Sequence, residues 1–323
     1  MNLKGKKVLV TGGTGLIGQQ LIKFLKEEGA NIRIVSLDNN SLVPPDIEFM
    51  QLDLMNFDNC KKACENVDVV FNLIGIKTSP KIIKEKPANI FVSYLRFNTN
   101  IIEAARQSNV GWFLYVSTIG VYSPTDVMSE DELWNGFPSK HDWYGGWAKR
   151  MGEMQLETYK IQYGLNNYSI IRPANVYGPY DDFSETSMVI PSLIKRVYNK
   201  ENPFVVWGDG TSIRDFIYSE DVARAMIFAV TNEINEPLNV GSGKGISIKD
   251  VVNTVIEISD YIPEIIWDIS KPSGDKQRIL NTNKLNNYGF TPKINLKDGL
   301  TKTLEWYKLN SSTIDGKRYN VFK

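Results

Sequence analysis

Residues 141–153 read HDWYGGWAKRMGE and bring a tyrosine and a lysine to the start of an expected helix. Residues i and i+4 of a helix lie on one face, so a Tyr and a Lys at that spacing would form a proton-transfer pair. Here Tyr144 and Lys149 are five residues apart, and Gly145 stands four before the lysine. Three interpretations are open: a catalytic pair in an altered register, a site that has lost its acid, and an ordinary helix start.

A glycine-rich segment near the N-terminus, VLVTGGTGLIG at residues 8–18, predicts dinucleotide binding. An apolar run enters it and a helical pattern leaves it, and in that context the glycines let a pyrophosphate approach the N-terminus of the helix. A merely structural turn is the alternative. The residues expected at the cofactor are Gly12, Thr14, Gly15, Leu16, Ile17 and Gly18.

Two acidic residues follow later apolar runs. Asp38 ends the second run, where a carboxylate accepts both ribose hydroxyls and repels a 2′-phosphate, so NAD is favoured over NADP. Arg33 and Ser36 lie nearby and keep NADP open as the less favoured cofactor. Asp53 could reach the adenine amino group, or it could simply cap the helix that follows.

The elements that must position these residues alternate along the first half of the chain. Short β-branched runs predict strands at 6–11, 31–37, 47–52, 67–75, 112–118 and 167–173, and helical periods lie at 15–29, 56–67, 88–109 and 146–164. This alternation predicts an α/β fold, a Rossmann-type doubly wound parallel sheet. We expect residues 1–172 to form a cofactor-binding domain, to which part of 215–241 returns. Residues 173–323 are expected to form mainly a smaller, interleaved α/β substrate-binding domain.

Composition excludes several classes of function. Lysine plus arginine and aspartate plus glutamate both number 37, so net charge gives no attraction to nucleic acid or anionic membrane. The longest nearly apolar run, 67–76, is too short to span a bilayer. Two cysteines, Cys60 and Cys64, suit a reducing compartment and have no further ligands nearby, so we expect a cytoplasmic protein without a metal site. His141 is the single histidine, and the G-x-S-x-G elbow of a serine hydrolase is absent.

Taken together, these motifs resemble the extended short-chain dehydrogenase/reductase superfamily, in particular its NAD-dependent nucleotide-sugar branches that hold UDP-galactose 4-epimerase and GDP-fucose synthase. The resemblance covers nearly the whole chain. Its segments are VTGGTGLIG (10–18), Asp38, Asp53-Leu54, NLIGIK (72–77), STIGVY (117–122), Lys149, RPANVYGPYDDF (172–183), VIPSL (189–193), WGDGTSIRDFIYSEDVA (207–223) and KPSGDKQR (271–278).

The resemblance implies roles for individual residues. Thr118 would hydrogen-bond the reacting oxygen, and Lys149 would hold the nicotinamide ribose and lower the pKa of a catalytic tyrosine. Further cofactor contacts would come from Asp53, Leu54, Leu73, Ile74, Gly75 and Pro173. Substrate contacts would come from Lys77, Asn175, Tyr180, Arg214, which matches an arginine that grips the diphosphate, and Arg278 as a second grip.

The chain departs from that pattern at three places. The family tyrosine lies four before the lysine, where Gly145 stands. The Asp-Glu pair of sugar dehydratases is replaced by Ile119-Gly120, and the Cys and His of 3,5-epimerisation are replaced by Gly120 and Tyr180. Sugar dehydration and 3,5-epimerisation are therefore disfavoured, and hydride transfer at the sugar C4 remains.

The proton route stays open among three hypotheses. In the first, Gly145-Gly146 is non-helical, so that Tyr144 can swing back over the site. In the second, the proton is carried by Tyr122, by Tyr180, or by Thr118 with water. In the third, the site binds its ligands without turnover. The leading function is an NAD-dependent nucleotide-sugar 4-dehydrogenase or reductase, with GDP-sugars favoured. A 4-epimerase and a nucleotide-sensing protein are the alternatives. The resemblance also implies a homodimer built from the helices near 88–109 and 146–163.

Overall fold

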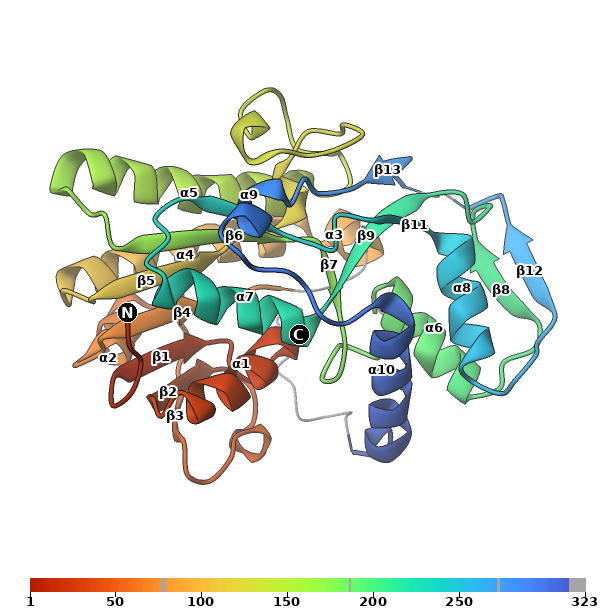
Figure 1. Cartoon of the computed structure of the whole chain (residues 1–323), viewed down its shortest axis with the longest axis horizontal. Coiled ribbons are helices and arrows are strands. Elements are labelled where there is room, and N and C mark those ends of the chain that lie inside the picture. Colours follow the sequence, from red (N-terminus) through yellow and green to blue (C-terminus); the bar gives the residue numbers. More distant parts are fainter. Residues whose placement is uncertain (77–79, 186, 272–273, 314–323) are drawn as a thin grey trace.

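The computed structural model describes residues 1–76, 80–185, 187–271 and 274–313, so the expected substrate contact Lys77 lies outside the described residues. A seven-stranded sheet in the order β10-β6-β5-β4-β1-β2-β3 forms its centre, with every neighbouring pair parallel (Figure 1). The strands are β1 (Lys7–Thr11), β2 (Asn31–Ser36), β3 (Glu48–Gln51), β4 (Val69–Asn72), β5 (Trp112–Val116), β6 (Tyr168–Pro173) and β10 (Pro237–Val240).

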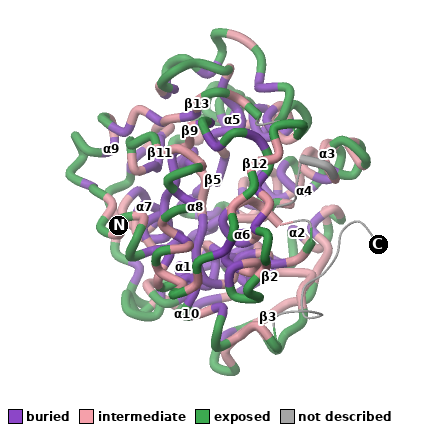
Figure 2. Tube along the Cα trace, turned by 90° about the vertical axis from the view of Figure 1, so that its right-hand side faces the viewer, coloured by how far each residue is buried: buried purple, intermediate pink, exposed green. Residues whose placement is uncertain are grey.

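Helices cover both faces of this sheet, which confirms the α/β doubly wound fold. They are α1 (Leu16–Glu27), α2 (Phe57–Cys64), α4 (Pro87–Gln107), α5 (Trp143–Tyr163) and α7 (Ser219–Thr231), with one short helix, α3 (Pro80–Glu85), before α4. One core lies between the sheet and α1 and α7, and a second between the sheet and α2, α4 and α5. Buried residues run through this interior, and exposed ones line the outside (Figure 2).

The second half of the chain adds smaller sheets beside the carboxyl ends of the central strands. One sheet holds β7 (Asn175–Tyr177), β9 (Ile213–Tyr218), β11 (Gly245–Ser247) and β13 (Gln277–Arg278), and a two-stranded sheet holds β8 (Phe204–Trp207) and β12 (Ile265–Asp268). The remaining helices are α6 (Val189–Tyr198), α8 (Ile248–Glu257), α9 (Asn283–Asn287) and α10 (Leu296–Asn310). A third core joins α6, α8 and α10 to these strands.

Single turns of 3₁₀ helix shape the loops around the site. They are η1 (Asn40–Leu42), η2 (Ile119–Val121) and η3 (Glu130–Glu132). Between the second-half strands the chain returns to the central sheet, where β10 pairs with β6 and α7 packs on α1. No helix in the described ranges is long and apolar enough to cross a membrane.

Candidate active site

The glycine loop between β1 and α1 forms a cradle that fits a pyrophosphate. Gly12 has φ +65°, a left-handed conformation that glycine adopts without strain. A Cβ at Gly18 would come within 2.6 Å of the Gly13 backbone, so only glycine lets α1 begin this close to the loop. Gly15 caps α1 with no side-chain hydrogen bond, so the first N–H groups of the helix are left for an anion.

The carboxylate of Asp38 lies against this loop. Thr14 donates a hydrogen bond from Oγ1 to Asp38 at 2.6 Å, and Thr14 Oγ1 lies 2.8 Å from the Ser36 hydroxyl. Arg33, which kept NADP open, is turned elsewhere: its Nε donates to Glu48 at 2.7 Å, and its Nη1 donates to the carbonyls of residues 63 and 65. The cation nearest to Asp38 in sequence is therefore held away on the β3 side.

The loops after β3 and β4 complete the cofactor side. Asp53 accepts the backbone N–H of Met55 at 2.9 Å, which closes the turn into α2 and uses one carboxylate oxygen. Leu54 is buried. A Cβ on Gly12 would lie 3.3 Å from the Leu73 carbonyl oxygen and 3.4 Å from Ile74, so the loops after β1 and β4 touch.

Lys149 is buried where β5 ends. Its Nζ donates to the carbonyl oxygen of Val116 at 2.7 Å and to that of Ile74 at 3.3 Å. Burial lowers the pKa of this ammonium to about 7, against a smaller opposing effect of Glu153. Thr118, two residues after Val116, caps η2 and accepts the N–H of Gly120 at 3.2 Å. The structure thus brings both sequence-predicted catalytic residues to one edge of the sheet.

The start of α5 differs from expectation. The helix begins at Trp143 and not at 146, so Tyr144, Gly145 and Gly146 are all helical. The hypothesis of a non-helical Gly145-Gly146 is wrong, because the chain after Asp142 already has helical hydrogen bonding. Each helical residue turns about 100°, so Tyr144 is rotated by about 100° from Gly145 and by about 140° from Lys149, five residues later. Tyr144 is 38% exposed and makes no hydrogen bond within the described residues.

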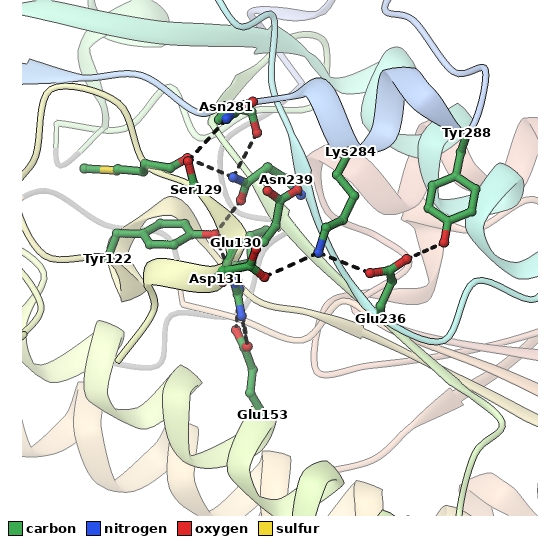
Figure 3. Close-up of polar contacts among 12 residues, drawn as sticks. Tyr122, Ser129, Glu130, Asp131, Glu153, Glu236, Asn239, Asn281, Lys284 and Tyr288 are labelled. Atoms are coloured by element: carbon green, nitrogen blue, oxygen red, sulfur yellow. Dashed lines mark hydrogen bonds and ion pairs between the residues drawn. The ribbon is translucent and has the colours of Figure 1, made fainter. Parts of the chain in front are cut away.

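The two other tyrosines proposed as proton carriers, Tyr122 and Tyr180, pack against other parts of the protein. Tyr122 donates to Asn239 at 2.7 Å and accepts from Arg172 at 2.7 Å in the buried network drawn in Figure 3, and burial raises the pKa of its phenol. Tyr180 packs its ring 4.7 Å from that of Trp306, between their centroids.

Two arginines stand side by side on the second sheet. Arg214 on β9 and Arg278 on β13 are register partners in a parallel pair, and burial, with a smaller effect of the Arg278 charge, lowers the pKa of Arg214. Arg278 forms an ion pair of 2.5 Å with Asp142 and a longer one of 3.8 Å with Asp275. Such a pair of guanidinium groups fits a diphosphate.

Asp142 joins this arginine pair to the catalytic edge. It directly precedes α5, and a Cβ on Gly120 would lie 3.0 Å from its carboxyl carbon. Nearby, Asn175 donates from its amide to the Asp215 carbonyl at 2.8 Å, and Pro173 ends β6. Asp142 was not predicted from the sequence, where the only indication of its role is its position three residues before Gly145.

A second missed residue is Tyr94 on α4. Lys149 Nζ lies 5.1 Å from its ring centroid. Its hydroxyl accepts the N–H of Ile76 at 2.8 Å and donates to the carbonyl of Ile76 at 3.1 Å. No sequence spacing links α4 to α5, so only the packing of the two helices reveals this contact.

A model of the NAD dependent epimerase/dehydratase family matches residues 8–241. The chain belongs to this family. The expectation of an NAD(P)-dependent enzyme of the nucleotide-sugar epimerase and reductase group is confirmed at that level.

Several members of the epimerase/dehydratase family match almost end to end. GDP-L-fucose synthase 1 of Arabidopsis thaliana is 29% identical over 96% of this chain and 95% of its own. A putative UDP-glucose 4-epimerase of Methanocaldococcus jannaschii is 30% identical over 95% of this chain and 100% of its own. The structure of UDP-glucose 4-epimerase from Thermus thermophilus in complex with NAD superposes with a TM-score of 0.83 at 26% identity, covering 94% of this chain and 99% of that one.

Proposed function

We propose that this protein is an NAD-dependent oxidoreductase that acts at C4 of a sugar carried on a nucleoside diphosphate, with GDP-sugars favoured. The observation that carries the proposal is the Arg278–Asp142 ion pair, because it sets an arginine pair beside the helix that bears Lys149. A diphosphate held by Arg214 and Arg278 would direct its sugar toward Thr118 and Lys149. The preference for GDP rests on the relative named GDP-L-fucose synthase.

Each group of the site has a distinct part in this proposal. The bound nicotinamide would supply or take up the hydride at C4. Thr118 would donate a hydrogen bond to the C4 oxygen, and Lys149 would hold the ribose and stabilise negative charge beside it. Asp38 would accept the ribose hydroxyls of the adenosine half and disfavour a 2′-phosphate.

A 4-epimerase is the second candidate, supported by the relative and the superposed structure that bear that name. Both reactions need the same chemistry at C4. Epimerisation also needs the 4-keto sugar to rotate in the site, so that hydride returns to its opposite face. A nucleotide-sensing protein without turnover is the third, motivated by Gly145.

One incubation experiment separates the three. The purified protein is mixed with NAD, NADH, NADP or NADPH and with a panel of GDP- and UDP-sugars, including 4-keto sugars, while nicotinamide absorbance and sugar stereochemistry are followed. A net change of cofactor redox state supports the dehydrogenase or reductase. C4 inversion without net redox change supports the epimerase, and binding without either reaction overturns catalysis.

We also propose a homodimer through α4 and α5. On α4, Phe97 lies in the core and Tyr94 packs against Lys149. Exposed apolar side chains on these helices, Val92, Met154 and Ile161, would form the contact. Light scattering at micromolar concentration tests this proposal, and a monomeric mass would overturn it.

A further inference from the structure

The phenol that the family places on α5 is missing, and its place is vacant. A Cβ built on Gly145 meets no heavy atom within 4 Å. Gly145 lies four residues before Lys149 in a continuous helix, so a side chain there would share the face of the lysine. Tyr144 lies on another face of the same helix. If a side-chain phenol serves this site, it must come from another element.

Two described tyrosines place their rings beside the Lys149 ammonium. The ring centroid of Tyr115 lies 5.0 Å from Nζ and that of Tyr94 lies 5.1 Å from it. Tyr115 is fully buried in β5, and its hydroxyl donates to the backbone carbonyl of Lys149 at 3.3 Å. A Cβ on Gly152 would lie 2.3 Å from that hydroxyl, so the Tyr115 oxygen is enclosed beneath the helix.

The hydroxyl of Tyr94 is differently placed. It reaches from α4 to the loop after β4, where it binds both backbone groups of Ile76. It lies 3.2 Å from a Cβ built on Gly75, and Gly75 is an exposed residue of the same loop. This loop also provides the Ile74 carbonyl that accepts from Lys149. The Tyr94 oxygen therefore lies beside an exposed residue of the loop after β4, whereas the Tyr115 oxygen is enclosed.

We propose that Tyr94 is the catalytic acid and base, replacing from α4 the phenol that α5 lacks. The inference rests on the proposed function. On reduction of a 4-keto sugar, the Tyr94 O–H bond breaks and its proton goes to the C4 oxygen as hydride reaches C4. The phenolate that remains accepts the Ile76 N–H, its ring lies beside the Lys149 ammonium, and solvent then returns the proton. Oxidation of the alcohol runs through the same steps in reverse.

Burial and the neighbouring groups shift the pKa of the Tyr94 phenol. Burial raises the pKa of Tyr94 to about 12, the Ile76 N–H lowers it, and the carboxylate of Asp142 raises it. One change on cofactor binding would reduce that pKa, because a positively charged nicotinamide would favour the phenolate. The Arg278 guanidinium, paired with Asp142, partly neutralises the carboxylate that opposes ionisation.

The first test is a substitution with a rescue. Tyr94→Phe should lower kcat by about 10²–10⁴-fold, the usual loss for a positioned acid or base, with NAD affinity nearly unchanged. Adding Gly145→Tyr to that variant should restore much of the loss, because the position is open and shares the lysine face. Tyr159→Phe is the matched control, since it also removes a phenol that joins α5 to α4, through Glu103.

The second test does not depend on turnover. NAD⁺ binding is measured by calorimetry in buffers of different ionisation heat, which counts the protons released. Wild type should release protons as the oxidised ring favours the phenolate, and Tyr94→Phe should release fewer. If Tyr94→Phe is unstable, 3-fluorotyrosine at position 94 keeps the ring and should shift the pH–rate profile to lower pH.

The outcomes are distinguishable. Wild-type turnover with full activity in folded Tyr94→Phe overturns the role of Tyr94 and leaves the proposed function standing. An unshifted pH–rate profile in the fluorotyrosine protein also overturns it. Absence of turnover in wild type on every sugar overturns the proposed function, and the proton count then still decides whether Tyr94 is the group that ionises beside the cofactor.

Discussion

Lys149 Nζ lies 2.7 Å from the carbonyl oxygen of Val116, which fixes a buried ammonium to the end of β5. Only 5% of Lys149 is exposed, and burial lowers its pKa to about 7. A buried cation held by two carbonyl oxygens costs stability in the unliganded protein. The catalytic role proposed for the charge would explain why this residue is kept.

Lys149→Met should therefore stabilise the unliganded protein and abolish turnover. The folded pKa lies below the unfolded value of about 10.4, so the unfolded state binds the extra proton between these values. Wild-type stability then rises with pH through that window, and the full cost is present below it. The gain from Lys149→Met should be largest near neutral and lower pH and should shrink toward about pH 10. Denaturant unfolding at several pH values measures it, and a gain that is constant with pH would contradict the assignment.

Glu153→Ala should destabilise the protein by about 3–5 kcal/mol, because it leaves a buried cation without its partner. Arg172 Nη2 lies 2.6 Å from the Glu153 carboxylate, and both side chains are almost fully buried. Glu157→Ala, one turn later on the same helix and exposed, is the control and should change little. Equal unfolding midpoints for the two variants would show that the ion pair is unimportant.

Asp38→Ala should weaken NAD binding and reduce the preference over NADP. Loss of charged hydrogen bonds to the ribose is worth about 1.5–3 kcal/mol, or roughly 10–150-fold in affinity. Arg33 is bound by Glu48, so it should not create strong NADP binding in the variant. Dissociation constants for both cofactors test this, and equal affinities in wild type would remove the role of Asp38.

Arg214→Ala should weaken nucleotide-sugar binding by roughly 10–150-fold, from about 1.5–3 kcal/mol for a charged contact to phosphate. Cofactor affinity should not change. Arg196→Ala is the control, because this arginine is bound to Glu201 in the same part of the chain. Calorimetric titration with GDP and UDP separates the two variants, and unchanged affinity in Arg214→Ala would refute the diphosphate contact.

Tyr144→Phe should leave kcat within about twofold of wild type, since a helical residue five before the lysine is turned about 140° from it. Its hydroxyl makes no hydrogen bond in the described part of the chain, so stability should also be unchanged. Steady-state kinetics beside Tyr94→Phe provide the measurement. A large loss of kcat in Tyr144→Phe would return the proton to this residue.

The sequence predicts what depends on local spacing. Gly12 and Gly18 can be interpreted from their positions between a strand and a helix, and Asp38 from the end of the second strand. Thr118 directly follows β5, and Lys149 reaches the end of that strand from α5 through the Val116 carbonyl, so one strand end positions both residues. The start of α5 could not be fixed from sequence, because paired glycines suggest a break and the helix nevertheless begins at Trp143. Tyr94 and Asp142 were missed because their contacts join elements that are distant in sequence, to Ile76 and Arg278.

The Asp142–Arg278 ion pair also bears on the rate at which an anionic ligand would dissociate from Arg278. A guanidinium with a carboxylate beside it keeps an anionic partner when an anionic ligand dissociates. If Arg278 holds a diphosphate as proposed, the Asp142 carboxylate would compete with it and shorten its residence time. The ion pair would then favour frequent exchange of the nucleotide over tight retention.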